Sequence, residues 1–121
     1  SALRRRGVPF GVVSSSWRWY VEHCLRELGM YEDAAVIVTG SDGLPLKPAP
    51  APYQAAARVF RPAPPGAVLA VEDSGSGVRS AVAAGLACAA VYNPDSGAQD
   101  LSPARWRLNS LYELPALLDG N

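Results

Sequence analysis

Short apolar runs alternate with longer amphipathic stretches along the chain. Four runs of five or six residues are rich in Val and Ala and lack an apolar–polar alternation, so they predict strands at 8–13, 35–39, 67–71 and 87–92. Uninterrupted apolar strands of this length are typical of a parallel sheet that is covered on both faces.

The stretches between these runs predict the covering helices. From Trp17 to Leu28 the apolar residues recur at intervals of three and four, and Gly29 follows as a stop signal. Three further helices are expected, at 51–60, 78–84 and 111–118. The alternation of strand and helix predicts an α/β fold, and the length of 121 residues suits a single domain over 1–121.

Composition argues against several classes of protein. Lys and Arg together number 11, as do Asp and Glu, so there is no surplus of positive charge for binding nucleic acid. No apolar run approaches the ~20 residues that span a bilayer, so no membrane partner is expected. Two cysteines, Cys24 and Cys88, are too few for a disulfide framework or a zinc site. We expect both thiols to be buried and reduced, in a cytoplasmic protein.

Distinctive polar residues follow the predicted strands, at the edge where open parallel sheets bind their ligands. Ser14, Ser15 and Ser16 come after the first strand and lead into a helix. Their hydroxyls and the backbone N–H groups at that helix start suit an anion such as phosphate. The alternative is that one serine only caps the helix.

Lys47 and the adjacent pair Glu72 and Asp73 are the other candidates. Lys47 is the only lysine in the chain, and its ammonium group suits a phosphate or a carboxylate as a point charge. The alternative is a solvated surface lysine. Glu72 and Asp73 end the third strand, and paired carboxylates suit Mg²⁺. The alternative is that Asp73 caps the next helix while Glu72 points to solvent.

Two other interpretations of these residues are weaker. Gly75-Ser76-Gly77 resembles the start of a dinucleotide-binding G-x-G-x-x-G fingerprint, but Ser80 stands at the third glycine and two carboxylates would face the pyrophosphate. A Ser-His-Asp hydrolase would need a G-x-S-x-G turn, which the sequence lacks. We expect His23, on the polar side of the first helix, to be a solvated surface residue.

Three segments of the chain belong together as a pattern. They are the serines after the first strand, the K-P-x-P-x-x-Y string that begins at Lys47, and the E-D-S-x-x-G-V string that begins at Glu72. In this order and spacing they resemble motifs two, three and four of the haloacid dehalogenase (HAD) superfamily, and most closely its β-phosphoglucomutase and sugar-phosphate phosphatase branch. The resemblance implies a three-layer, Rossmann-like parallel sheet with helices on both faces.

The resemblance also implies roles for these residues. Ser14, helped by the backbone N–H of Ser15, would bind the transferring phosphoryl group. Lys47 would neutralise that group and the nucleophile, and Glu72 and Asp73 would hold Mg²⁺. The implied activity is Mg²⁺-dependent phosphoryl transfer, by a phosphatase or phosphomutase, on a small phosphorylated metabolite such as a sugar phosphate.

Parts of the family's pattern are not found in the sequence. The nucleophile that forms the aspartyl-phosphate is the first Asp of a D-x-D-x-[TV] motif on the first strand, and no two Asp residues here are two positions apart. The cap domain that sets substrate choice is absent too, and Arg18 stands where some relatives carry a phosphate-contacting Asn. The resemblance therefore covers the C-terminal part of the catalytic core, and this chain alone is predicted to be inactive.

The missing motif has a structural consequence. The family's sheet has the strand order 5-4-1-2-3, so the missing first strand is the central one. We predict that the strands at 8–13 and 67–71 either pair with each other or leave a gap. The alternative function is a non-catalytic phosphate- and Mg²⁺-binding fragment, or a half-protein whose partner chain supplies the first strand.

Overall fold

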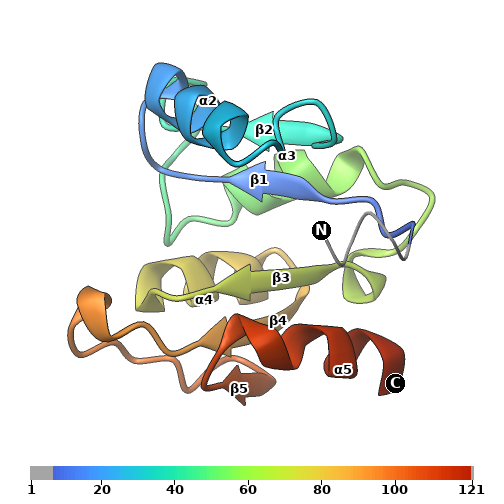
Figure 1. The fold of residues 1–121 in the computed structure, drawn as a ribbon, viewed down its shortest axis with the longest axis vertical. Coiled ribbons are helices and arrows are strands. Elements are labelled where there is room, and N and C mark those ends of the chain that lie inside the picture. The colour runs from blue at the N-terminus through green and yellow to red at the C-terminus, as the bar shows by residue number, and fades with distance from the viewer. Residues whose placement is uncertain (1–6, 121) are drawn as a thin grey trace.

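The protein is an alternation of strands and helices, described for residues 7–120 by a computed structural model. The strands are β1 (Gly11–Val13), β2 (Val36–Val38), β3 (Leu69–Glu72), β4 (Ala87–Val91) and β5 (Trp106–Leu108). The α-helices are α2 (Arg18–Glu27), α3 (Ala51–Arg58), α4 (Gly75–Ala83) and α5 (Leu114–Gly120). Short 3-10 turns are η1 (Pro65–Ala67), η2 (Pro94–Ser96) and η3 (Leu111–Glu113). The predicted α/β class is confirmed (Figure 1).

The strands form two separate parallel sheets. β1 pairs with β2, and β3, β4 and β5 form a second sheet in that order. β1 and β3 face each other across a gap that no strand within residues 7–120 fills (Figure 1). Of the two outcomes predicted for these strands, pairing with each other or a gap, the structure has the gap. We call β1, α2 and β2 the two-stranded unit, and β3, α4, β4 and β5 the three-stranded unit.

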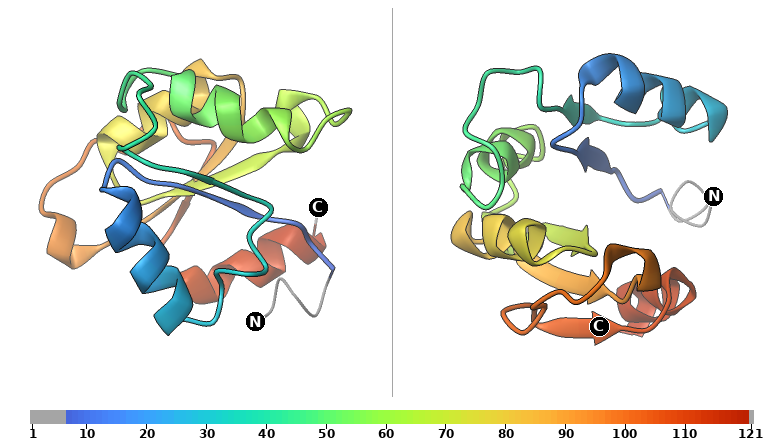
Figure 2. Two further views of the ribbon diagram at one scale, coloured as in Figure 1. Left: turned by 90° about the horizontal axis from the view of Figure 1, so that it is seen from above. Right: turned by 90° about the vertical axis from the view of Figure 1, so that its left-hand side faces the viewer.

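Helices cover both faces of the strand layer. In Figure 2, α3 and α4 lie on one face of the strands, and α2 and α5 lie on the other. Helix α3 contacts β1 and β2 in one unit and α4 in the other, so it bridges the gap. Ser80 on α4 strengthens this bridge, because its hydroxyl donates to the Ala49 carbonyl in the loop before α3 at 2.7 Å. No helix within residues 7–120 is long and apolar enough to cross a bilayer.

The larger hydrophobic core belongs to the three-stranded unit. Its buried members are Tyr53, Ala70, Val78, Ala81, Leu86, Cys88, Ala90 and Ala104. Many of these side chains are small, which lets helix α4 approach the sheet closely at high packing density. The two-stranded unit buries Val21, Leu25 and Val38.

Several elements differ from the sequence prediction. Strand β1 covers only the last three residues of the strand predicted at 8–13, and the helix predicted at 111–118 begins as the 3-10 turn η3 and continues as α5 to Gly120. Helix α4 begins at Gly75 rather than at 78, because the Ser74 hydroxyl accepts the Gly77 N–H at 3.1 Å and caps an earlier first turn. Strand β5 was not predicted. It has only three residues, and Arg107 interrupts its apolar pattern.

The two cysteines differ in their surroundings. Both are free thiols. Cys88 on β4 is buried, as expected, with 1% of its surface exposed. The expectation that Cys24 is also buried is wrong, because this residue lies half-buried on α2 in the less enclosed two-stranded unit.

Candidate active site

A cavity of about 840 Å³ lies at the carboxyl ends of the strands. Its lining comes from the segments that follow β1, β3, β4 and β5, and from the loop before α3. Parallel strands present their carboxyl ends at one edge, so residues far apart in the sequence meet there. Every site residue predicted from the sequence lines this cavity: Ser14, Ser15, Lys47, Glu72 and Asp73.

Backbone contacts hold the two serines after β1. The Ser14 N–H donates to the Val38 carbonyl at 2.9 Å, and the Ser14 hydroxyl accepts the Ser16 N–H at 3.1 Å. Helix α2 has Trp17 as its N-cap and no side-chain cap. The alternative that one serine only caps this helix is therefore wrong.

Lys47 joins the two units. Its Nζ donates to Glu72 Oε2 at 2.6 Å and to the Val13 carbonyl at 3.1 Å. Val13 ends β1 and Glu72 ends β3, so one ammonium group binds the ends of two strands that do not pair with each other. The Lys47 side chain is only 11% exposed, which makes the alternative of a solvated surface lysine wrong.

Glu72 is a buried carboxylate with three close neighbours. Its Oε2 accepts hydrogen bonds from Lys47 and from the Tyr53 hydroxyl. Gly77 leaves room for it, because a Cβ at that position would lie 1.9 Å from Glu72 Oε1. Since Glu72 is buried and Ser74 is the cap of α4, the alternative in which Asp73 caps the helix and Glu72 points to solvent is wrong.

Tyr53 on α3 is a site residue whose contact with Glu72 the sequence analysis missed. Burial, together with the nearby charge of Glu72, raises the pKa of the Tyr53 phenol well above its usual range. The phenol is therefore a hydrogen-bond donor to the carboxylate at every physiological pH. The sequence feature that could have identified Tyr53 is its place at the end of the K-P-x-P-x-x-Y string.

Asp73 is exposed at the mouth of the cavity and meets a second residue that was missed. Its Oδ2 accepts a hydrogen bond from Asn93 Nδ2 at 2.8 Å. Asn93 comes shortly after the end of β4, and Asp73 comes directly after the end of β3. This place after a strand is the sequence feature that could have identified Asn93 as a site residue. The segment 109–112, which follows the unpredicted strand β5, forms a further wall of the cavity.

The chemistry of this donor set fits Mg²⁺. Glu72 and Asp73 supply carboxylate oxygens at the end of β3, and Mg²⁺ is usually held by one or two carboxylates together with water and phosphate. Within residues 7–120 no three His, Cys, Asp or Glu side chains gather closely enough to hold a metal by themselves. Further ligands would come from water, from phosphate, from other oxygen atoms of the protein or from groups outside these residues.

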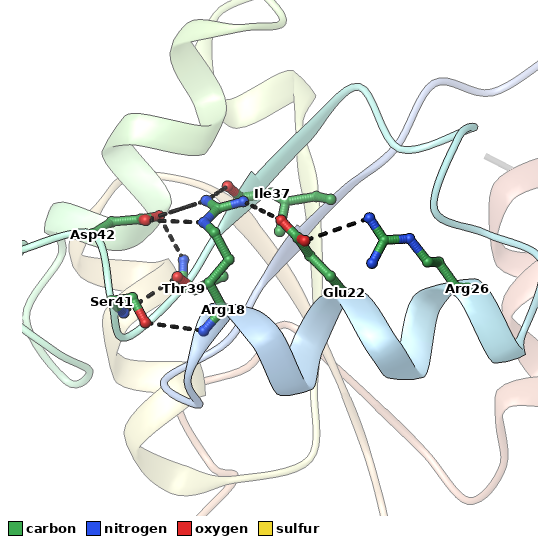
Figure 3. A network of polar contacts seen from close by, with 7 residues as sticks. All are labelled: Arg18, Glu22, Arg26, Ile37, Thr39, Ser41 and Asp42. Atoms are coloured by element: carbon green, nitrogen blue, oxygen red, sulfur yellow. Dashed lines mark hydrogen bonds and ion pairs between the residues drawn. The ribbon is translucent and has the colours of Figure 1, made fainter.

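The other interpretations of the sequence find little support in this geometry. The Glu72 carboxylate lies against Gly77 in the first turn of α4, where a dinucleotide would need to place its anionic pyrophosphate. His23 is exposed on α2, as expected, and does not line the cavity. Arg18 does not line the cavity either, and its guanidinium contacts Asp42, Glu22 and the Ile37 carbonyl instead (Figure 3).

Comparison with known proteins shows what the chain is similar to. The family model described as haloacid dehalogenase-like hydrolase matches residues 1–85. The protein named "Putative phosphatase YhcW" from Bacillus subtilis is 35% identical over 122 residues, which cover 98% of this chain and 54% of that protein. The validoxylamine A 7'-phosphate phosphatase of Streptomyces hygroscopicus subsp. limoneus is 32% identical over 113 residues, with 86% of this chain and 53% of that protein covered.

Solved structures of known proteins are also similar to this chain. The crystal structure of CbbY from Rhodobacter sphaeroides in complex with phosphate superposes with a TM-score of 0.84 and 30% identity, over 93% of this chain and 51% of that one. Another crystal structure of CbbY contains xylulose-(1,5)bisphosphate. The chain thus spans about half the length of the relatives that it matches.

Proposed function

The chain belongs to the haloacid dehalogenase-like hydrolase family, and from that premise we propose that its cavity binds the phosphoryl group of a small phosphorylated metabolite with Mg²⁺ as cofactor. One observation carries the proposal, namely that two serines, one lysine and two carboxylates meet in a single cavity. A lysine and a divalent cation stabilise the charge on a transferring phosphoryl group.

Each residue has a role in this proposal. The Ser14 hydroxyl and the Ser15 backbone N–H hold phosphoryl oxygens. Lys47 lies between the end of β1 and Glu72, and neutralises charge on the phosphoryl group. Glu72 and Asp73 hold Mg²⁺, which when bound screens the negative charge of the phosphate.

Tyr53 and Asn93 support the two carboxylates. Each donates one hydrogen bond, Tyr53 to Glu72 and Asn93 to Asp73, and so orients a carboxylate of the proposed Mg²⁺ site. Outer hydrogen bonds of this kind fix the direction of metal ligands.

The proposed substrate is a sugar phosphate or a similar small phosphorylated compound. Support comes from the named relatives, one of which acts on validoxylamine A 7'-phosphate and another of which binds xylulose-(1,5)bisphosphate. Both relatives are about twice as long as the matched region, so the parts that select their substrates need not correspond to this chain. The proposed reaction is phosphoryl transfer by a phosphatase or a phosphomutase.

The nucleophile in this proposal is an Asp outside residues 1–121, which forms the aspartyl-phosphate. A second candidate function follows from the gap, because the facing edges of β1 and β3 can accept one more parallel strand. In that case the chain is a phosphate- and Mg²⁺-binding half whose partner chain supplies the strand. A cytoplasmic location stays a prediction that rests on the two free cysteines.

The test combines turnover and binding on the 121-residue chain. We expect no Mg²⁺-dependent hydrolysis of p-nitrophenyl phosphate, but binding of inorganic phosphate that weakens at least tenfold in Lys47→Met and that loses its Mg²⁺ dependence in Asp73→Asn. Asp95→Asn, at an exposed turn, is the control and should bind like the wild type. Hydrolysis that Asp73→Asn abolishes would contradict a nucleophile outside the chain, and phosphate binding indifferent to Lys47 would contradict the site.

A further inference from the structure

Arg18 makes a set of contacts that the proposed function does not use. Its Nη2 donates to the Ile37 carbonyl at 2.9 Å and to Asp42 Oδ2 at 3.1 Å, and its Nη1 donates to Glu22 Oε2 at 3.2 Å. Its backbone N–H donates to the Ser41 hydroxyl at 2.9 Å. The start of helix α2 is therefore tied to the loop 39–42 that follows β2 (Figure 3).

Asp42 fixes the shape of that loop from within. Its Oδ2 accepts the Thr39 N–H at 2.8 Å as well as the Arg18 guanidinium. The Ser41 N–H donates in turn to the Thr39 hydroxyl at 3.2 Å, and Thr39 is buried. The Thr39 hydrogen bond, followed by the contact with Arg18, lowers the pKa of Asp42, so the carboxylate is charged at neutral pH.

The loop 39–42 lies directly against the loop 14–16 that carries the two cavity serines. The Gly40 N–H donates to the Ser16 carbonyl at 2.8 Å. A Cβ at Gly40 would lie 2.2 Å from the Ser15 carbonyl oxygen, so the two backbones touch with no side chain between them. A shift of the loop 39–42 would therefore either push on the backbone of Ser15 and Ser16 or break the hydrogen bond that holds it.

We propose that Arg18 and Asp42 are positioning residues that hold the loop 14–16 at the cavity through the loop 39–42. Neither residue lines the cavity, so neither is a ligand of the phosphate. The inference rests on the proposed function, in which Ser14 and Ser15 bind the phosphoryl group. The planar guanidinium is suited to this task because it can reach a backbone carbonyl and a carboxylate at once, which a lysine ammonium does less well.

Two carboxylates on the same guanidinium provide a matched pair of variants. Asp42→Asn removes the charge that faces the loop, and Glu22→Gln removes the charge that faces the helix. Their side chains are similarly exposed, at 27% and 22%. With inorganic phosphate as the probe and Mg²⁺ present, we expect Asp42→Asn to weaken binding about tenfold and Glu22→Gln to change it by less than about twofold.

A second readout separates positioning from general destabilisation. Amide hydrogen exchange of the Gly40 N–H reports the contact with the loop 14–16, and exchange of the Tyr92 N–H, bonded to the Leu108 carbonyl at 2.9 Å, reports the three-stranded unit. We expect Asp42→Asn to speed exchange at Gly40 at least tenfold and to leave Tyr92 unchanged. Arg18→Lys, which keeps the charge but loses the planar fork, should show the same local change.

The outcomes distinguish this inference from the proposed function. If the wild-type chain does not bind inorganic phosphate, the proposed function fails, and the positioning role fails with it. If the wild type binds but Asp42→Asn binds equally well, or exchange at Gly40 and Tyr92 rises together, the positioning inference alone is wrong. Arg18→Lys behaving as wild type in both readouts would also overturn it.

Discussion

Strand β4 in the three-stranded unit has a neighbour on each side, and four of its five residues are buried. In the two-stranded unit each strand has one neighbour, and of the six strand residues only Val38 is buried. Helix α2 and its two flanking residues leave Trp17, Trp19 and Leu28 exposed at 66%, 70% and 70%. The same βα pattern therefore buries a full core only where the sheet continues on both sides.

This difference bears on the candidate site, because the site draws on both units. The serines belong to the end of β1, and the two carboxylates belong to the end of β3. Lys47, on the loop before α3, is the residue that contacts both strand ends. The proposed binding at the cavity would thus depend on contacts between two sheets that do not pair with each other, and the following predictions test those contacts.

The largest loss of stability is expected from removing the ion pair between Lys47 and Glu72, which connects the two units. Lys47→Met leaves the buried Glu72 carboxylate without its cation, and removal of one partner of a buried ion pair costs about 3 to 5 kcal/mol. Arg26→Met is the control, since the Arg26 side chain is 57% exposed and its ion pair with Glu22 should contribute less than about 1 kcal/mol. Urea unfolding of both variants measures the difference. An equal loss in the free energy of unfolding for both variants would contradict a buried ion pair between the units.

A pair of leucines compares the two cores directly. Leu86 in the three-stranded unit and Leu25 in the two-stranded unit are equally buried, at 7% and 6% exposure. We expect Leu86→Ala to lower the free energy of unfolding by about 4 kcal/mol and Leu25→Ala by about 2 kcal/mol, because the thinner unit can collapse around the lost volume. The reverse order in urea unfolding would show that the two-stranded unit is the better packed.

Two glycines test the close approaches in each unit. Gly77→Ala places a methyl group on the Glu72 carboxylate, and this overpacking should outweigh the helix propensity gain of about 1 kcal/mol, with a net loss of about 2 kcal/mol. Gly40→Ala should displace the loop 14–16 and weaken binding of inorganic phosphate. Gly66→Ala is the control, because nothing lies within 4 Å of its Cβ position. Thermal unfolding of Gly77→Ala at or above the wild-type midpoint would refute the contact.

The smallest effect concerns alkaline pH. Burial, followed by the Glu72 charge, raises the pKa of the Cys88 thiol to about 11. The unfolded thiol ionises first as the pH rises from about 9, so this group's contribution to stability is present below that pH and falls by about 1 kcal/mol by pH 10. Cys88→Ala should flatten the decline in the free energy of unfolding, measured with urea, between pH 8 and 10. A decline as steep in Cys88→Ala as in the wild type would contradict this effect of burial.

The sequence supports prediction of the fold well where apolar runs are continuous. Four strands and the first helix follow from such runs, and the gap follows from the absence of a central strand. The edge strand β5 could not be predicted because it has only two apolar residues. The residue between them, Arg107, is exposed, as is common on an edge strand. The early start of α4 was hidden by Gly75 and Gly77, which have low helix propensity.

In the candidate site, the positions of the residues could be predicted from the sequence, but their contacts could not. The position of the serines, the lysine and the carboxylates at strand ends was predictable, because parallel strands end at one edge. The contacts were not, since Lys47 and Tyr53 reach Glu72 only after α3 packs between the two units. The contact between Arg18 and Asp42 likewise joins the start of α2 to the loop 39–42, which lies far from it in the sequence.

The most direct test of the central claim, that one site spans both units, is calorimetric titration of the 121-residue chain with inorganic phosphate, with and without Mg²⁺. Phosphate would bind beside the serines of one unit, and Mg²⁺ beside the carboxylates of the other. We predict that Mg²⁺ strengthens phosphate binding at least fivefold, and that phosphate strengthens Mg²⁺ binding by the same factor. Phosphate binding of equal strength with and without Mg²⁺, or none at all, would contradict the account.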